Sequence, residues 1–274
     1  MSDAVTLTLR GAIGRRLEAE SILPDAFATL DEAGIARLPL WDGPCVVPLG
    51  DVFHVRGGRS TTVRIAGDLA LVDAIGAGMS TGDLRVEGAV GRYVGTRMSG
   101  GTLRVGGDAG YGAGLEMSGG LLDVGGNAGD RLGAGRLAAA RGMAGGEIIV
   151  RGTAGAEIGA SMRRGTVIVA GNAGPRAGIG MIAGNVIVFG SAGEDPGRFN
   201  KRGTIVVCGG VRVAPTYRYD CTYRPPHIAV TMVHLKSRRK FSIDDDPSTA
   251  RFRRYSGDMA ELGRGEILAR TDER

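Results

Sequence analysis

Residues 98–126 read MSGGTLRVGGDAGYGAGLEMSGGLLDVGG, one 19-residue unit and the start of the next. The pattern M-x-x-G-x-[LIV]-x-V-x-G recurs along the chain with steps of 19, 19, 26, 19, 19 and 19 residues. The units begin at Met79, Met98, Met117, Met143, Met162 and Met181, with Asn200 in the methionine position of a seventh. A fixed period over more than a hundred residues predicts a stack of like structural units.

Two apolar columns appear when the units are aligned. The first column is Leu84, Leu103, Leu122, Ile148, Val167, Val186 and Ile205. The second, two residues later, is Val86, Val105, Val124, Val150, Val169, Val188 and Val207. Apolar, largely β-branched residues at i and i+2 are typical of a strand with one buried face. A polar corner column, made of Asp108, Asn127, Thr153, Asn172 and Ser191, is interpreted as a turn ladder.

Nineteen residues with this much glycine hold short strands and corners but no long helix. Successive units should therefore pair in parallel, and parallel crossovers are almost always right-handed. We predict an all-β fold: a right-handed parallel β-helix of about seven 19-residue coils with small terminal caps. A leucine-rich repeat is the runner-up, because residues 167–172 echo part of its pattern, but the upstream leucine and a helical leg are missing.

The flanking segments divide the chain into three predicted parts. Residues 1–44 form an N-terminal cap with a strand at 5–10 and a short helix at 24–36. Residues 45–210 form the β-helix, irregular at first and regular from 75. Residues 211–274 form an extended C-terminal wrap over 211–235 and a short helix within 257–270.

Composition excludes several classes of protein. The 274 residues carry 49 glycines without a collagen-like triplet order, a net charge of +5 and only 5% aromatic residues. Three scattered cysteines favour a reducing compartment. The chain begins MSDAVTLTLR, without a signal-peptide pattern, and contains no run of 18 apolar residues. We therefore expect a cytoplasmic protein that does not bind a membrane. Nucleic acid is not an expected partner either, because the arginines are not interleaved with aromatic residues.

The glycine-rich coils carry corners such as Ile75-Gly76-Ala77-Gly78, Gly112-Ala113-Gly114 and Gly133-Ala134-Gly135. Over residues 75–210 this sequence resembles the GXGXG domain. That domain is known from the C-terminal part of the glutamate synthase large chain and from the C subunit of formylmethanofuran dehydrogenase. It also forms the C subunit of the related bacterial formyltransferase/hydrolase complex. A free-standing chain with its own cap is most similar to these subunits, and the arginine-rich composition favours the bacterial complex.

The resemblance implies a non-catalytic scaffold subunit in one-carbon metabolism, where formaldehyde is oxidised to formate. Its complex would convert formyl-tetrahydromethanopterin through formylmethanofuran to formate. The implied partners are a metal-dependent amidohydrolase-like subunit, a formyltransferase subunit and further dehydrogenase-like subunits. The alternatives are an archaeal-type formylmethanofuran dehydrogenase and a glutamate-synthase-type spacer. A carbohydrate-acting β-helix would need a carboxylate column, which the repeats do not contain.

The residues themselves predict no active site in this chain. The histidines His54, His227 and His234 lack metal-ligand spacing. Cys208 follows an inward valine and is interpreted as a buried or corner thiol. Strings such as Gly106-Gly107-Asp108-Ala109-Gly110 lack the following helix that a dinucleotide loop needs. We therefore predict no catalytic residue, no metal ligand and no tightly held cofactor.

Two features go beyond a plain structural interpretation. The residue between the inward columns is charged in Arg85, Arg104 and Asp123 but aliphatic in Ile149, Ile168, Ile187 and Val206. Either the chain's own C-terminal segment or a partner subunit must cover this aliphatic column, and we assign it to a partner interface. The 26-residue step adds a surface excursion within Asp130–Gly142, where Arg131, Arg136 and Arg141 are further candidates for partner contacts.

A second candidate site is basic. Arg163-Arg164 and Lys201-Arg202 occupy the same repeat columns two coils apart, and Arg198 is near in sequence. Solvated surface charge is the simple interpretation. The resemblance adds a functional one, since methanofuran-type cofactors carry an oligoglutamate tail that these five side chains could bind.

Overall fold

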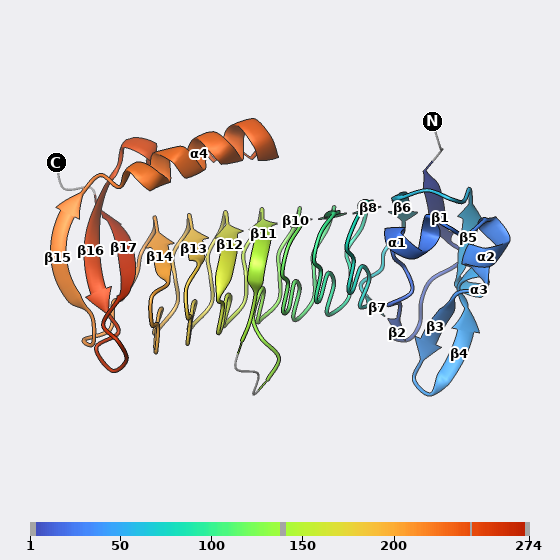
Figure 1. Cartoon of the computed structure of the whole chain (residues 1–274), viewed down its shortest axis with the longest axis horizontal. Coiled ribbons are helices and arrows are strands. Elements are labelled where there is room, and N and C mark those ends of the chain that lie inside the picture. Colours follow the sequence, from blue (N-terminus) through green and yellow to red (C-terminus); the bar gives the residue numbers. More distant parts are fainter. Residues whose placement is uncertain (1–3, 138–140, 242, 272–274) are drawn as a thin grey trace.

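A computed structural model describes residues 4–137, 141–241 and 243–271. This part of the chain is mostly strand with few helices, arranged as a long stack with a small cap at each end (Figure 1). The main sheet has thirteen strands in the order β15-β16-β17-β14-β13-β12-β11-β10-β9-β8-β6-β1-β5. Its repeat strands are β8 (Asp83–Val86), β9 (Thr102–Val105), β10 (Leu121–Val124), β11 (Ala144–Val150), β12 (Arg164–Val169), β13 (Asn185–Val188) and β14 (Thr204–Val207).

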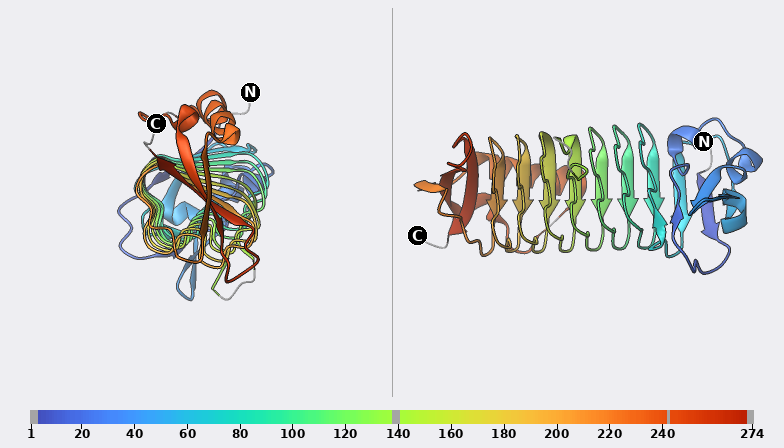
Figure 2. Two further views of the ribbon diagram at one scale, coloured as in Figure 1. Left: turned by 90° about the vertical axis from the view of Figure 1, so that its left-hand side faces the viewer. Right: turned by 90° about the horizontal axis from the view of Figure 1, so that it is seen from below.

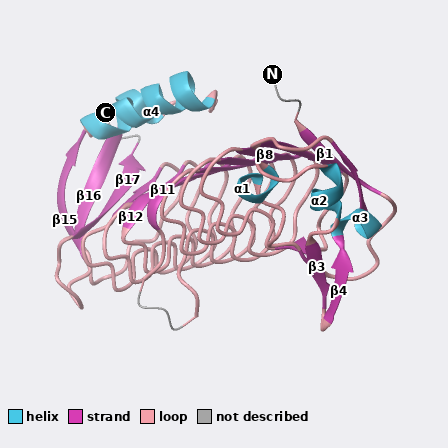
Figure 3. Ribbon diagram, turned by 45° about the vertical axis from the view of Figure 1, so that its right-hand side comes forward, coloured by secondary structure: helices cyan, strands magenta, loops and turns pink. Residues whose placement is uncertain are grey.

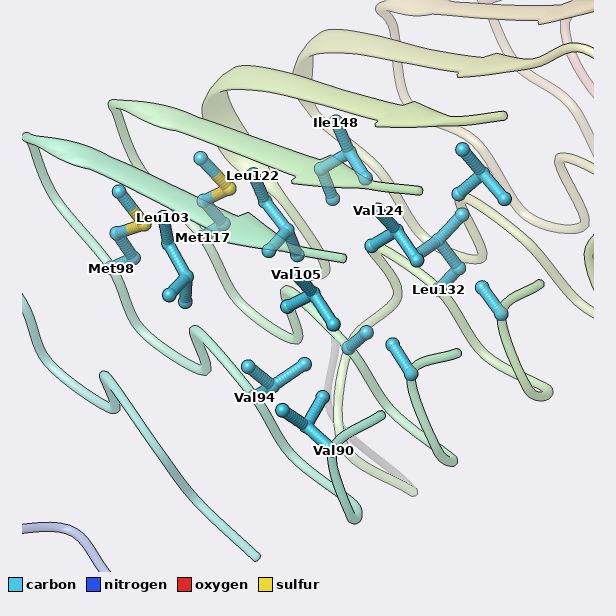
Figure 4. Packing of buried hydrophobic residues seen from close by; sticks show 14 of the residues in the cluster. Val90, Val94, Met98, Leu103, Val105, Met117, Leu122, Val124, Leu132 and Ile148 are labelled. Carbon is cyan, nitrogen blue, oxygen red and sulfur yellow. The ribbon is translucent and has the colours of Figure 1, made fainter. Parts of the chain in front are cut away.

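These seven strands pair in parallel, each with the next along the chain. Equivalent repeat positions lie opposite one another, as Leu84 does with Leu103. The pairing holds across the 26-residue step, where Leu122 lies opposite Ile148. Both predicted inward columns are at most 2% exposed, so their direction is confirmed. Figure 4 shows Leu103, Leu122 and Ile148 stacked in the interior.

The methionine and the glycine of the repeat are two halves of one contact. A β-carbon at Gly101 would lie 2.6 Å from Met79 Cε, and one at Gly120 would lie 2.7 Å from Met98 Cε. Non-bonded carbons do not approach so closely, so the methionine of one unit occupies the space that only a glycine leaves free in the next. Gly101 also has a φ of +75°, in the region that side chains disfavour. The contact therefore ties consecutive units together.

The polar corner column forms the predicted turn ladder. Asp108 Oδ1 accepts a hydrogen bond of 2.6 Å from the backbone N–H of Asn127, and Asn127 Oδ1 accepts one of 2.9 Å from that of Thr153. Asn172 Oδ1 likewise accepts from the N–H of Ser191 at 2.8 Å. In these three pairs the side chain of one corner satisfies a backbone N–H of the next.

The N-terminal cap differs in detail from its prediction. The single helix expected over 24–36 is two short ones, α1 (Pro24–Phe27) and α2 (Glu32–Ala36), because Asp31 Oδ1 caps a new helix by accepting from the N–H of Gly34. The boundary at residue 45 must also move. There β4 (Cys45–Pro48) forms an antiparallel hairpin with β3 (Pro39–Asp42), and regular parallel pairing begins only at β6 (Thr62–Ala66).

The remaining cap elements complete both sheets. β1 (Val5–Leu9) pairs in parallel with β6 and antiparallel with β5 (Phe53–Arg56), which follows α3 (Leu49–Val52). A second sheet has the order β4-β3-β2-β7, with β2 (Leu17–Glu18) and β7 (Val72–Asp73). Its β3–β4 hairpin extends from the body of the molecule (Figure 3).

The C-terminal part corrects two predictions. The extended wrap expected over 211–235 contains β15 (Arg218–Tyr223) and the 14-residue helix α4 (Pro226–Arg239), with Pro226 at a helix start that tolerates proline. The helix expected within 257–270 is instead largely strand. Two strands, β16 (Arg251–Gly257) and β17 (Gly265–Thr271), follow the short 3-10 turn η1 (Pro247–Thr249). β17 pairs in parallel with β14 and so extends the stack.

Helix α4 lies along the outer face of the sheet (Figures 1 and 2). Its buried residues Ile228, Met232 and Leu235 join one apolar cluster with the aliphatic column, which is at most 8% exposed. The assignment of Ile149, Ile168, Ile187 and Val206 to a partner interface is therefore wrong, since the chain's own helix covers them. None of the described helices is long and apolar enough to cross a membrane.

A substitution in this column should destabilise the isolated chain. We expect Ile168→Asp to lower the free energy of unfolding by about 3 kcal/mol or more, because the carboxylate would be buried without a partner. Urea denaturation of the purified chain measures this. Val230→Asp is the matched control. Val230 also lies on α4 but is 69% exposed, so this change should lower the free energy of unfolding by less than about 1 kcal/mol. Equal effects would contradict the covering role of α4.

The loop between β16 and β17 is held by a buried carboxylate. Asp258 is 3% exposed, and it accepts backbone hydrogen bonds of 3.0 Å from Phe199 and 3.0 Å from Ala260. Burial by itself raises the pKa of Asp258, but these hydrogen bonds outweigh it and hold the pKa below its ordinary value. A depressed folded-state pKa contributes stability that is present above the unfolded pKa of about 4 and is lost as pH falls through the folded value.

The stabilisation by Asp258 should therefore depend on pH. We expect Asp258→Asn to lower the free energy of unfolding by about 1–2 kcal/mol at pH 7. The difference from the wild type should shrink as the pH falls below about 4, where the unfolded carboxyl becomes protonated. Asp195→Asn, at a half-exposed carboxyl, serves as the control in the same denaturation series. A difference that grows toward acid pH would refute the assignment.

Candidate functional site

A basic groove lies on the outer face of the sheet, where the end of α4 meets the strands from β8 to β11. It encloses about 500 Å³. Its charged lining consists of Arg85, Arg104, Asp123, Arg151, Arg238, Arg239 and Lys240. Six of these side chains are cationic and one is anionic, so the groove carries a concentrated positive charge.

Ion pairs compensate half of the cations. Arg104 Nη1 lies 2.6 Å from Asp83 Oδ2. Arg151 binds both carboxylate oxygens of Asp123, at 3.1 and 2.9 Å. Arg239 Nε donates to Glu147 Oε2 at 2.6 Å, and His234 Nε2 lies 3.2 Å from the other oxygen of that carboxylate. These pairs hold the groove walls and fasten α4 to β11.

Three exposed cations remain in the groove. No ion pair within the described ranges involves Arg85, Arg238 or Lys240. Their charges add in one cleft, where low-dielectric walls strengthen the potential that an anion meets. Arginine also offers paired donors that match a carboxylate or a phosphate. The groove therefore suits a ligand with several carboxylate or phosphate groups.

The sequence alone does not reveal this groove as a unit. Arg85 and Arg104 are recognisable as outward-facing, but Arg238, Arg239 and Lys240 lie more than 130 residues later. Only the packing of α4 on the aliphatic column brings the two groups together. The only signal in the sequence is the run of adjacent basic residues after position 237. Because the segment before this run is predicted to be extended and not helical, the sequence does not indicate which face of the sheet the run would reach.

The basic residues predicted as a site lie elsewhere. Arg163, Arg164 and Arg202 are exposed, and Lys201 is half-buried. The unit between the two basic pairs carries Ile182 and Ala183 at these positions. One apolar pair therefore separates the two basic pairs along the stack.

Arg198 is already engaged, because it lies 3.5 Å from Asp195 and its guanidinium stands 5.1 Å from the ring centre of Phe199. Binding of a cofactor tail by these five residues stays a prediction.

The arginines of the insertion have three different environments. Arg131 pairs with Glu157 and donates a 2.7 Å hydrogen bond to the carbonyl of Gly135, so it supports the loop from inside. Arg136 is largely exposed, 3.6 Å from Glu116, and Arg141 is exposed. Only Arg136 and Arg141 are therefore available for the predicted partner contacts.

The structure also places the cysteine and the histidines that the sequence analysis considered. Burial raises the pKa of the Cys208 thiol to about 12, so the thiol stays protonated at neutral pH. His227 and His234 lie on α4, not on an extended segment. Within residues 4–137, 141–241 and 243–271, no three His, Cys, Asp or Glu side chains are grouped to hold a metal ion.

Comparison with known proteins places this geometry in context. No family model matches the chain. The C subunit of molybdenum-containing formylmethanofuran dehydrogenase 1 from Methanosarcina barkeri is 40% identical over 95 residues, 33% of this chain and 32% of that protein. The C subunit of the formyltransferase/hydrolase complex Fhc from Methylorubrum extorquens is 38% identical over 87 residues, 32% of this chain and 33% of that protein. Each aligned segment thus spans about a third of the relative.

The structural match is nearly complete. A chain in the crystal structure of the formyltransferase/hydrolase complex (FhcABCD) from Methylorubrum extorquens, solved with methylofuran, superposes with a TM-score of 0.88 at 34% identity. The match covers 97% of this chain and 99% of that one. Together with the two relatives found by sequence, it shows that the chain belongs to the family of C subunits of the formyltransferase/hydrolase and formylmethanofuran dehydrogenase complexes.

Proposed function

We propose that this chain is a non-catalytic scaffold subunit of a cytoplasmic formyltransferase/hydrolase complex. The complex converts formyl-tetrahydromethanopterin through formylmethanofuran to formate in one-carbon metabolism. The near full-length match to a chain of such a complex carries the proposal.

We infer that the scaffold is a right-handed parallel β-helix of about seven coils with a cap at each end. The continuous parallel pairing from β6 to β14 supports this inference. Units stacked at about 4.8 Å make a stiff rod roughly 30 Å long, along which larger subunits can be held at a set spacing. The chemistry then belongs to the partners: a metal-dependent amidohydrolase-like subunit, a formyltransferase subunit and dehydrogenase-like subunits.

An archaeal-type formylmethanofuran dehydrogenase is the second candidate assembly, because the Methanosarcina barkeri relative is 40% identical over its aligned segment. The two differ in their partners. Subunits of a molybdenum enzyme would identify this second assembly, and a formyltransferase with an amidohydrolase-like subunit would identify the first. A glutamate-synthase-type spacer would instead be fused to, or co-purify with, an amidotransferase.

Affinity purification of the tagged chain from its native host tests the assembly. We expect amidohydrolase-like and formyltransferase subunits to co-elute in constant ratio, as determined by mass spectrometry. The complex should hydrolyse formylmethanofuran, and we expect the chain alone not to do so, because the proposal assigns the chemistry to the partner subunits. Turnover by the rigorously purified chain, or elution as a lone protein, would overturn the proposal.

Two basic surfaces are available for the acidic tail of a methanofuran-type cofactor: the predicted residues Arg163, Arg164, Arg198, Lys201 and Arg202, and the groove beside α4. We favour the groove. It is concave, and three of its cations are not engaged in ion pairs within the described ranges. The predicted residues lie on the surface, and Arg198 already contacts Asp195 and Phe199.

A synthetic oligoglutamate distinguishes the two surfaces. We expect Arg85→Ala and Arg238→Ala each to weaken its binding roughly two- to five-fold, the usual worth of one exposed charge. Arg163→Ala and Arg202→Ala are the matched controls and should change it little. Titration calorimetry at two salt concentrations measures the affinity, which should fall with ionic strength. Larger effects of Arg163→Ala and Arg202→Ala than of the groove variants would instead support binding at the residues predicted from the sequence.

A further inference from the structure

A second surface is built from the cap sheet and the corners of the first coils. In the order β4-β3-β2-β7, Val46 lies opposite Trp41, Trp41 opposite Glu18, and Glu18 opposite Asp73. Partners in register share one face of a sheet. The face therefore runs from an apolar edge at Val46 and Trp41 to a carboxylate edge at Glu18 and Asp73.

The apolar edge is open to solvent. Trp41 is 45% exposed and Val46 is 52% exposed, and the neighbouring pair Pro39 and Pro48 is exposed too. A two-stranded hairpin gains nothing from displaying a tryptophan to water. Tryptophan is, however, the residue most enriched among the anchors of protein interfaces.

The carboxylate edge leads directly into a cavity. Glu18 and Asp73 line a space of about 440 Å³, together with Tyr93, Tyr111, Leu115 and Leu137. The two tyrosine rings meet edge to face at 5.7 Å. Leu137, on the insertion loop, is 76% exposed. Of the ten large apolar side chains that are exposed among the described residues, four belong to this surface: Trp41, Val46, Tyr93 and Leu137.

One buried polar atom in the cavity has no partner. Thr96 lines it and is 4% exposed, and its hydroxyl makes no hydrogen bond. Buried hydroxyl groups are nearly always satisfied. The hydroxyl of Thr96 is thus an unsatisfied polar group in the wall of the cavity.

The lining of the cavity has an excess of carboxylates, although the chain has a net charge of +5. Its cavity is lined by Glu18, Glu20 and Asp73 against a single arginine, Arg136. Asp73 is compensated by Arg16 at 2.6 Å, whereas Glu20 lies 3.8 Å from Arg97 with both side chains more than half exposed. Glu18 forms no ion pair among the residues that the structure describes. A basic side chain beside an apolar one would complement this rim.

The hairpin and the insertion loop both extend from the same side of the stack (Figures 1 and 3). The cavity lies between them, since the sheet of the hairpin supplies Glu18 and Asp73 and the loop supplies Arg136 and Leu137. Of the described residues of the 26-residue step, Arg136 and Leu137 line the cavity on the side of the loop.

We propose that the face of Val46, Trp41 and Glu18, continued by the cavity up to Leu137, binds an extended segment of a partner subunit. The segment carries an apolar side chain that enters the cavity and a lysine or arginine that pairs with Glu18. The identity of the partner rests on the proposed function, while the surface itself does not.

Trp41 is the only tryptophan of the chain, which allows a direct observation. The chain is labelled with 5-hydroxytryptophan, which can be excited selectively, and is assembled with unlabelled partner subunits. We expect acrylamide quenching of the label to fall several-fold on assembly, because Trp41 becomes buried. Unchanged quenching in an assembled complex would overturn the inference.

Variants test the energetic role. We expect Trp41→Ala to weaken assembly roughly 30-fold, the size of a hot-spot loss. Glu18→Lys should weaken it more than Glu18→Gln does, since it repels the basic side chain. Val46→Ser is compared with Val230→Ser as a control. Val230 is also exposed, but it lies on α4, so its replacement should leave assembly unchanged. Circular dichroism and urea denaturation of each chain establish that it folds; normal assembly of folded Trp41→Ala would contradict the proposal.

The outcomes separate the two proposals. If the wild-type chain assembles with no formyltransferase-type partner, the proposed function fails. If it assembles but Trp41 stays accessible, only the binding surface fails. If the isolated chain sediments as a dimer that Trp41→Ala dissociates, a second copy occupies the surface, and a partner segment is excluded.

Discussion

The whole molecule depends on the contact between a methionine of one unit and a glycine of the next. A β-carbon at Gly101 or Gly120 would collide with the methyl group of Met79 or Met98. The glycine lets the methionine fill the interior at the point where the chain enters each strand. The contact recurs from unit to unit, and the strands stay in register over the seven units.

The last unit shows how the constraint ends. Asn200 takes the methionine position and bonds the N–H of Gly203 at 2.7 Å and its carbonyl at 2.8 Å. Its side chain lies where a β-carbon of Gly265 would otherwise fit, so β17 can close against β14. The polar replacement is satisfied locally, and it marks the transition from repeated units to the C-terminal cap.

The two proposed surfaces both depend on how the caps pack against the stack. Helix α4 of the C-terminal cap covers the aliphatic column and brings Arg238 and Lys240 to the groove that Arg85 of β8 also lines. At the N-terminal end, the β3–β4 hairpin carries Trp41 beyond the body of the stack and adjoins an acidic cavity. If both proposals hold, the anion-binding groove and the partner-binding surface lie on different faces of the chain and would not compete with each other.

Periodicity alone was sufficient to predict the all-β class, the inward direction of the Leu84 and Val86 columns, and the corner ladder through Asn127. Each of these features depends on contacts between equivalent positions of adjacent units. The repeat identifies those positions directly in the sequence. The family resemblance could be identified for the same reason.

Non-repeated segments could not be predicted in this way. Pro225-Pro226 is compatible with either an extended chain or a helix start, and only the exposed apolar column of Ile149 and Ile168 made the helix favourable. The basic groove and the surface around Trp41 each join residues far apart in sequence. Which residues each surface brings together depends on which segment packs on which face of the stack. The free energy of burying the apolar faces determines that packing, and it is not visible in the sequence.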